Sequence, residues 1–444
     1  MTLRHLVVSL FAFLFGCGYI TVYVETAPPS DRGRFNIEID GATELADAAD
    51  RSVLSQKGLR TGSHKLSETA GTATDLQDFT GKISGDCDPD GRFIISHGDD
   101  KSCTITNTRV NPPPPIGPQR TAIILIGSQG AGPHPYMDKT ATASIFYSSA
   151  NPQSARSFYF QASYGQLIIV GSDRSKDGTA SDIYGPYDTG TISCNFDAIA
   201  LADPDIDYRQ YDRIVVLANG DQCGEGGVAS EIPGTYKTGE GTRQLTKATI
   251  FGHSFGDTTF NGRISNEALH EYGHTLGLYH AGAWYCGKAS VAPNGCYGNH
   301  VWEPIDLVSQ ESLYAHPNSV HKERLGWLTG LRVDTAGVSG TYIINAYEDG
   351  NNNLKVLKIP RKLSGGTGDA LGYYYLSYRR PTPPWDAWVA RTPSYANGVA
   401  IHIDETGHDF DGALLDATPG TIAGLADIHD GALALNQTFA DSLS

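Results

Sequence analysis

The stretch HEYGHTLGLYH, which begins at His270, contains the residues of this chain that are best spaced to do chemistry. His270 and His274 are four positions apart, so on a helix their imidazoles share one face and can bind one metal ion. Gly277 tolerates a positive φ and predicts the end of that helix, after which the chain can turn back and bring His280 to the same ion. Three protein nitrogens leave a fourth position for water, which is the arrangement of a catalytic zinc site.

Glu271 follows the first histidine and would lie beside the metal without binding it. Zinc lowers the pKa of its bound water to about 7, and a neighbouring carboxylate can take the proton as that water attacks a polarised carbonyl. The competing interpretation is a surface helix that happens to carry histidines, but it needs five fixed positions to coincide by chance. At these positions the chain resembles the metzincin metallopeptidases, whose extended zinc motif is H-E-x-x-H-x-x-G-x-x-H. The resemblance implies a Zn²⁺ cofactor.

The helix that carries this motif is predicted over residues 264–276, with Ser265 or Asn266 as its N-cap. In front of it, buried-strand runs alternate with helical segments, which indicates an α/β sheet. The predicted strands are 121–127, 163–172, 211–220 and 247–255, and the predicted helices are 151–164 and 194–203. In the metzincins an edge strand just before the zinc helix holds an extended substrate by β-augmentation, which implies that role for residues 247–255.

Residues 297–328 (YGNHVWEPIDLVSQESLYAHPNSVHKERLGWL) resemble the gametolysin-like branch of the metzincins, in which a turn with a methionine under the zinc precedes an H-K-x-x-L-G-W segment. Met1 and Met137 are the only methionines of this chain, so that methionine is absent. Ile305 stands where it would fall, with Leu307 as the alternative, and another apolar side chain can form the floor of the site by packing. Because the ligand set is complete, structural or surface roles are predicted for four further histidines, His253, His300, His316 and His321.

A β-sandwich module is predicted over residues 31–110. FNIEIDG and RFIISHG alternate apolar and polar residues, as half-buried strands do. The stretch from GSHKLSETAGT to CTITNTRV resembles the small β-sandwich repeats of bacterial surface proteins, which implies a Cys87–Cys103 disulfide and a spacer or adhesive role. A protease propeptide is the alternative. The run NPPPPIGP, residues 111–118, favours an extended polyproline linker and hence a domain boundary.

A C-terminal antiparallel β domain is predicted over residues 331–444, after the catalytic domain of residues 119–330. Its strand-like runs are GTYIINAYE, NLKVLKIP, GYYYLSYRRP and NGVAIHID. From YYLSYRRP onward the chain resembles the domain that follows the catalytic part in gametolysin-like and immune-inhibitor-A-like peptidases. Two clusters could bind structural Ca²⁺ or be solvated turns: Asp404, Glu405, Asp409 and Asp411, and Asp349 with Asn351, Asn352 and Asn353.

The first 30 residues and the cysteines predict export from the cell. Arg4 and His5 precede the apolar run 6–15, which is the layout of a secretory signal. A cleaved secretory signal is one possible fate of this segment. LFGC, ending at Cys17, resembles a bacterial lipobox, so a lipid anchor at Cys17 is the second. An uncleaved membrane anchor is the third, because apolar character continues to Val24. The other six cysteines fall into three neighbouring pairs, as an oxidising compartment allows: Cys87 with Cys103, Cys194 with Cys223, and Cys286 with Cys296.

These segments predict a multidomain protein with an all-β sandwich, a central α/β metzincin-like domain (a mixed sheet plus the zinc helix) and an antiparallel β domain. A net charge of −16 argues against nucleic acid and anionic membrane surfaces as partners. The favoured function is a secreted or surface-attached zinc endopeptidase that acts on extracellular proteins. The alternatives are a surface-binding or adhesive protein whose peptidase fold has lost turnover, and a zinc hydrolase of small amides or esters.

Overall fold

The computed structural model describes residues 17–441 except for 28–32, 73, 110–112, 128–137, 173–181, 190–196, 220–225, 252–254, 257–261, 293–295, 300–302, 310–313, 362–371, 387–391, 405–411 and 423. Its contacts divide the chain into two compact units, Met1–Asn111 and Pro112–Ser444. The division falls at the start of the proline-rich run. The described part of the protein is mostly β and contains four sheets.

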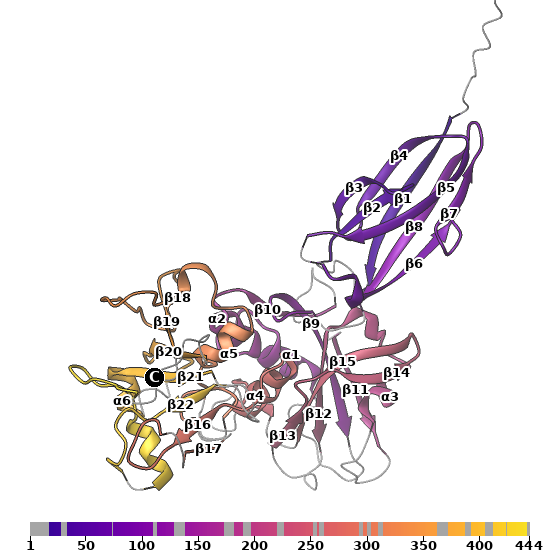
Figure 1. Ribbon diagram of the computed structural model, residues 1–444. Coiled ribbons are helices and arrows are strands. Elements are labelled where there is room, and N and C mark those ends of the chain that lie inside the picture. The colour runs from indigo at the N-terminus through magenta and orange to yellow at the C-terminus, as the bar shows by residue number, and fades with distance from the viewer. Residues whose placement is uncertain are drawn as a thin grey trace, which may run out of the picture. The chain divides into compact units, whose positions relative to one another are not determined.

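The first unit is a sandwich of two four-stranded sheets, with strand orders β4-β1-β8-β6 and β3-β2-β5-β7 (Figure 1). The strands are β1 (Cys17–Ala27), β2 (Phe35–Ile39), β3 (Ala42–Ala48), β4 (Val53–Arg60), β5 (Gly62–Ala70), β6 (Phe79–Gly85), β7 (Arg92–Ile95) and β8 (Asp100–Arg109). Alternate residues point inward, so Ile20, Phe35 and Phe93 from three strands meet in one core. The predicted Cys87–Cys103 disulfide is confirmed and belongs to that core.

Strand β1 corrects the predicted start of this module at residue 31. It lies between β4 and β8, antiparallel to the first and parallel to the second. Ile20, Val22 and Val24 are fully buried, whereas Tyr19 and Tyr23 are exposed. The apolar character that suggested an anchor up to Val24 therefore has the period of a strand. Residues 1–16, with the rest of the predicted export signal, lie outside the described residues. No helix among the described residues is both long enough and apolar enough to cross a membrane.

The second unit begins with a mixed sheet of order β10-β9-β12-β15-β13, in which β11 also pairs with β9 and β14 with β15. Its elements are β9 (Gly117–Gly127), α1 (Lys139–Phe146), α2 (Ala155–Ala162), β10 (Leu167–Val170), β11 (Ile183–Asp188), α3 (Ala198–Ala202), β12 (Arg213–Asn219), β13 (Gly226–Ala229), β14 (Gly234–Thr238), β15 (Gly241–Phe251) and α4 (Asn266–Thr275). Ile123 and Leu125 of β9 pack toward α1, α2 and α4, whereas Ala122 and Ile124 pack toward α3 on the opposite face (Figure 1). Helices thus cover both faces of a largely parallel sheet, as the alternating pattern predicts.

Strand β15 contains most of the segment predicted to be the edge strand, but it is not at the edge. It pairs with β12 on one side and with both β13 and β14 on the other. Among the described strands, β13 pairs only with β15. The prediction that residues 247–255 form the edge is therefore wrong, because the preceding segment folds back along β15 and covers it. The edge beside α4 is β13.

The second sheet of this unit has the order β17-β16-β22-β21-β20-β19-β18. Its strands are β16 (Gly282–Tyr285), β17 (Tyr297–Asn299), β18 (Val333–Thr335), β19 (Val356–Pro360), β20 (Tyr373–Tyr378), β21 (Val399–Ile403) and β22 (Ala413–Leu415), accompanied by α5 (Ser319–Arg324) and α6 (Pro393–Asn397). Strands β16 and β17 come directly after the histidine motif, yet β16 pairs with β22 near the end of the chain. Residues 331–444 belong to the same compact unit as the residues from Pro112 onward that precede them.

Two details of this second sheet differ from the sequence prediction. The β16–β22 and β18–β19 pairs are parallel, so the sheet is mixed and not purely antiparallel. The run GTYIINAYE, residues 340–348, is not a strand: it forms only an isolated bridge at Ala346, and Ile343 is 80% exposed. An alternating apolar pattern needs a partner strand and a core to pack on, and residues 340–345 have neither here.

The proline run is partly docked on the second unit. The carbonyl oxygen of Pro113 accepts a hydrogen bond from Arg213 Nη2 at 3.0 Å, and that of Pro115 accepts one from Trp327 Nε1 at 2.8 Å. Prolines lack an N–H, so their carbonyls are the backbone groups that can hold them in place. The later part of the predicted linker 111–118 therefore belongs to the second unit.

Candidate metal centre

Helix α4 begins two residues after and ends one residue before the predicted bounds of 264 and 276, and Ser265 is its N-cap as predicted. The hydroxyl of Ser265 caps its first turn by accepting a backbone N–H at 2.9 Å. Gly277 has a φ of 96°, and the N–H groups of Gly277 and Leu278 donate back to helix carbonyls at 2.8 and 3.4 Å. This pair of bonds is a Schellman ending, which satisfies the last carbonyls while the chain reverses. The reversal returns His280 to the helix.

The structure brings the three predicted ligands together. One ring nitrogen from each of His270, His274 and His280 lies within 4.8 Å of the other two, and the Nε2 atoms of His270 and His274 are 3.0 Å apart. Zinc–nitrogen bonds of roughly 2.0–2.1 Å in a tetrahedron place the nitrogens about 3.3 Å apart, so small side-chain movements would let all three bind one ion. Within the described ranges, no other group of three or more His, Cys, Asp or Glu side chains could hold a metal ion.

Backbone carbonyls orient two of these rings. His274 Nδ1 lies 2.6 Å from the carbonyl oxygen of Leu278, and His270 is hydrogen-bonded to the backbone of Leu307. Burial, together with the neighbouring His274 and His280, lowers the pKa of His270 to about 3, and burial also lowers the pKa of His274. Both rings are therefore neutral near pH 7, which is the form that binds a metal.

Glu271 lies beside the histidines and is 4% exposed. Burial raises its pKa to about 8, and the nearby Glu267 and Glu231 carboxyls add to that effect. Its Oε2 atom is buried and accepts no hydrogen bond from the described residues. A buried carboxylate oxygen is costly unless a ligand or water completes its contacts. A dication on the histidines, with its water, would do so and would favour the charged carboxylate. The residues present thus fit a zinc ion.

Edge strand β13 contacts the same helix. A Cβ added to Gly227 would lie 2.4 Å from Cγ of Glu271, so the strand comes this close only because residue 227 is glycine. Val228 and Ile232 are 58% and 63% exposed on this segment. Sequence reasoning missed the strand because GGVA is too short and too glycine-rich to show strand periodicity.

Leu307, and not Ile305, lies beneath α4. Leu307 belongs to the core that holds this helix, and a Cβ added to Gly273 would lie 3.6 Å from its Cδ2 atom. Ile305 is also fully buried, but it packs with Ala283 and Tyr395 in a different cluster. Of the two residues that the sequence analysis considered for the floor of the site, Leu307 is therefore the one that packs on α4.

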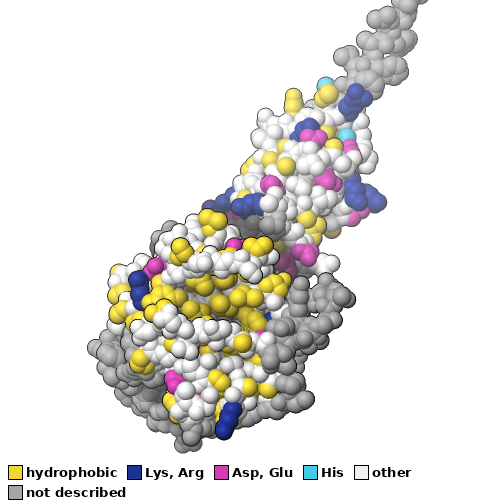
Figure 2. Space-filling view, turned by 60° about the vertical axis from the view of Figure 1, so that its left-hand side comes forward, with side chains coloured by type: hydrophobic (Ala, Val, Ile, Leu, Met, Phe, Trp, Pro, Cys, Tyr) yellow, Lys and Arg dark blue, Asp and Glu magenta, His cyan; other side chains and the backbone are white. Residues whose placement is uncertain are grey.

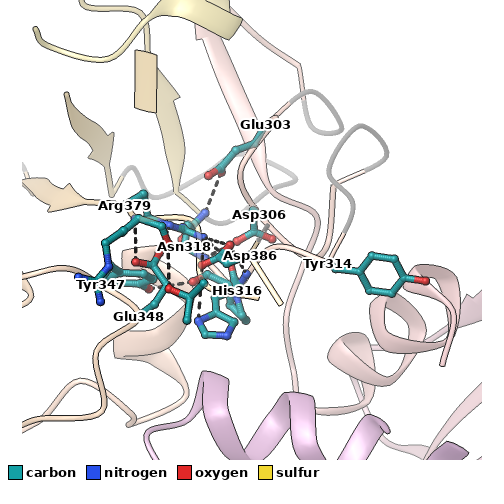
Figure 3. A network of polar contacts seen from close by, with 12 residues as sticks. Glu303, Asp306, Tyr314, His316, Asn318, Tyr347, Glu348, Arg379 and Asp386 are labelled. Atoms are coloured by element: carbon teal, nitrogen blue, oxygen red, sulfur yellow. Dashed lines mark hydrogen bonds and ion pairs between the residues drawn. The ribbon is translucent and has the colours of Figure 1, made fainter. Parts of the chain in front are cut away.

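His316 lies in a buried polar network of the second unit (Figure 3), and His321 is buried and bonded to Asp306 of the same network. Arg379 pairs with Glu348 and with Asp386, each at 2.8 Å, and all three side chains have no exposed surface. The backbone N–H of His316 donates to Asp386 at 3.1 Å. Mutual pairing is what makes such buried charges tolerable.

A second part of this network surrounds Asn318. Its side-chain amide donates to Glu303 at 2.9 Å, and Glu303 also contacts His402 at 2.7 Å. His321 Nδ1 lies 2.8 Å from Asp306. The predicted structural role of His316 and His321 agrees with these positions. No motif could have revealed the network, because its partners are up to 99 residues apart in the chain.

Some predicted residues lie outside the described ranges. They are His253, His300, the Cys194–Cys223 pair, and Glu405, Asp409 and Asp411 of one calcium candidate. The Cys286–Cys296 disulfide is confirmed and joins the ends of the β16–β17 hairpin just after His280.

The other calcium candidate is bound by cationic side chains. Arg380 Nη2 donates to Asp349 Oδ1 at 2.6 Å, and Lys355 Nζ donates to Asn351 Oδ1 at 2.7 Å. Oxygen atoms that are neutralised in this way have little left to offer a calcium ion. The positions favour the alternative prediction, a solvated turn.

A surface hollow of about 520 Å³ lies elsewhere in the second unit. Its rim includes Leu331 and Ile343, which are 78% and 80% exposed, and its wall includes Asp334 and Asn345. Figure 2 shows hydrophobic side chains gathered in a hollow on one face of this unit. The lining holds one carboxylate and no histidine or cysteine, so it does not offer a second metal site.

No family model matches the sequence, and no curated protein matches it. The site combines three converging imidazoles, two of them kept neutral by burial, with a buried carboxyl beside them and an edge strand in contact with that carboxyl.

Proposed function

We propose that this protein is a zinc-dependent endopeptidase that hydrolyses peptide bonds of extracellular proteins. The observation that carries the proposal is the convergence of three ring nitrogens within 4.8 Å beside a buried Glu271 oxygen that no described residue binds. The resemblance of residues 270–280 to the metzincin motif, and of residues 297–328 to the gametolysin-like branch, supports the same class. A bound zinc ion would supply a Lewis acid that polarises the scissile carbonyl and acidifies a water molecule.

The roles of the chain's own residues follow from their positions. His270, His274 and His280 would hold the ion, with two of the rings oriented by backbone carbonyls. Glu271 would take a proton from the attacking water and pass it to the leaving amine. A general acid–base works best with a pKa near the working pH, and burial raises the pKa of Glu271 to about 8.

Strand β13 supports a polypeptide as the substrate class. Its outer edge faces no described strand, so an extended chain laid beside it could pair with backbone groups other than the Gly227 N–H, which donates to Glu267. Gly227 holds this edge against Glu271, which would bring a bound backbone near the attacking groups. The exposed Val228 and Ile232 would then contact apolar side chains of that substrate.

The two disulfides among the described residues point to an oxidising, extracellular environment. Together with the sequence layout of residues 1–16, they support the proposal of a secreted or surface-attached protein. A protease in that location would encounter extracellular polypeptides as its substrates.

The test is the Glu271→Ala variant. It should keep one zinc per chain, measured by elemental analysis, and lose peptide hydrolysis by about 100- to 10,000-fold, because the proton acceptor is gone. Cleavage of a panel of denatured proteins, profiled by mass spectrometry, measures the loss. Glu240→Ala, which removes a carboxyl from the turn before β15, is the matched control and should cleave normally. Wild-type turnover by zinc-loaded Glu271→Ala would refute the assignment.

A surface-binding protein without turnover is the second candidate. It is favoured by the separate β-sandwich unit, on which Tyr19 and Tyr23 are 50% and 42% exposed, and by the lack of a methionine in the sequence of residues 297–328. A folded wild-type protein that contains stoichiometric zinc and cleaves nothing in the panel would support it. Cleavage that a chelator abolishes would exclude it.

A further inference from the structure

Glu267 places a second carboxyl next to Glu271. The two residues are four positions apart on α4, so their side chains lie on one face of the helix. Glu267 hydrogen-bonds to the side chain of Glu271 and to the backbone N–H of Gly227 on strand β13. It thereby connects the edge strand to the carboxyl next to the three histidines.

The contact with Glu267 holds the Glu271 carboxyl on the side of strand β13, where Oε1 of Glu271 would lie 3.0 Å from a Cβ added to Gly227. The bond sets the rotation of the Glu271 carboxyl.

The glycines of β13 make room for this arrangement. A Cβ on Gly227 would lie 2.4 Å from Cγ and 2.8 Å from Cδ of Glu271, and a Cβ on Gly226 would lie 3.5 Å from Oε1 of Glu267. Both carboxyl side chains are thus enclosed between the helix and the edge strand. The H-E-x-x-H motif does not include position 267, and its spacing alone assigns that residue no role.

We propose that Glu267 is a positioning residue, which holds the Glu271 carboxyl in the orientation from which it can take a proton from the attacking water. This inference rests on the proposed function. Glu267 acts through Glu271 and does not touch the metal or the substrate. Its removal should therefore affect the rate of the chemical step and leave metal and substrate binding intact.

Two variants separate positioning from a general structural role. Glu267→Gln keeps both contacts, because its amide can donate to Glu271 and its carbonyl oxygen can accept the Gly227 N–H. Glu267→Ala keeps neither. In the full-length, zinc-loaded protein we expect Glu267→Ala to lower kcat about 10- to 100-fold, with KM and zinc content unchanged, and Glu267→Gln to recover most of that loss. An Ala variant with wild-type kcat, or a Gln variant as slow as the Ala variant, would overturn the proposal.

A second measurement does not depend on activity. Melting temperatures of the metal-free full-length protein are compared for Glu267→Ala, Glu271→Ala and the double variant. Residues in contact give non-additive effects, so the double variant should differ from the sum of the two single shifts. Additive shifts would overturn the contact itself. If the wild type binds zinc but cleaves nothing, the proposed function fails. The comparison of the single and double variants would still decide whether Glu267 contacts Glu271.

Discussion

The imidazoles of His270 and His274 are neutral because α4 buries them, and burial lowers the pKa of each. The same burial raises the pKa of Glu271, because it disfavours the charged form of a carboxyl as it disfavours the charged form of an imidazole. Burial thus makes the two imidazoles suitable as metal ligands and makes the Glu271 carboxyl able to hold a proton. A cation bound by the histidines would favour the charged form of Glu271 and so oppose the effect of burial on its pKa.

The identity of the residue beneath the site is testable at this scale. Leu307→Ala should destabilise the protein by about 2–5 kcal/mol and weaken zinc binding, because Leu307 fills the core under α4. Leu307→Met keeps the volume and should cost less than about 1.5 kcal/mol. Denaturant unfolding and zinc competition titration measure the two effects. Ile305→Met is the control and should leave zinc affinity unchanged. Weaker zinc binding in Ile305→Met than in Leu307→Met would show that the floor has been misassigned.

At the scale of elements, the site is made by helix α4, the bend at Gly277 and strand β13. Tyr159 from α2 donates its hydroxyl to the carbonyl of Leu269 at 2.5 Å, and Tyr272 contacts Thr121 of β9 at 3.0 Å. These buried bonds fix the helix on the sheet. Because β13 belongs to that sheet, the distance between Gly227 and Glu271 is fixed as well.

Gly227→Ala tests the closeness of strand and helix. The new methyl group would lie 2.4 Å from Glu271 Cγ, so either the strand or the carboxyl must move. A displacement of about 1 Å at a reacting group can cost about 100-fold in rate, and we expect a fall of that order in kcat with zinc content unchanged. Val228→Ala changes the neighbouring exposed residue and is the matched control. Full activity in Gly227→Ala would mean that the closeness of β13 does not determine the position of the Glu271 carboxyl.

At the scale of the whole molecule, the chain consists of two units with separate cores. In the first unit, His64 Nδ1 contacts Asp40 at 2.7 Å and its Nε2 contacts the carbonyl oxygen of Arg60 at 2.8 Å, with the ring stacked on Phe93. Both nitrogens can donate at once only in the charged ring. Burial alone would lower the pKa of His64, but the bonds to Asp40 and Arg60 outweigh it and raise the pKa.

This contact predicts a pH dependence confined to the first unit. Since the folded pKa of His64 is raised, its stabilising effect is complete below the unfolded value of about 6.5 and is lost as the pH rises through the folded pKa. Calorimetry of the full chain should show the melting temperature of the sandwich falling as the pH rises above about 6.5. His64→Gln should remove that slope. A slope that persists in His64→Gln would assign it to another group.

Local interactions are what the sequence by itself determined. Ser265 caps α4 through the first turn, His270 and His274 share a face through the helical repeat, and Gly277 ends the helix through a positive φ. The neighbouring cysteine pairs Cys87–Cys103 and Cys286–Cys296 are close in the chain and were predicted for the same reason. Each of these features depends on residues within about one or two turns, or one hairpin, of one another.

Only the tertiary structure decided which distant segments meet. It placed β13 and not β15 at the edge, Leu307 and not Ile305 under the helix, and residues 282–285 in the same sheet as residues 413–415. It also put Gly227 of β13 against Glu267 and Glu271 of α4. These contacts join residues far apart in the chain, and which of them form depends on how the sheets and helices fill a common core, which periodicity and spacing along one segment do not encode.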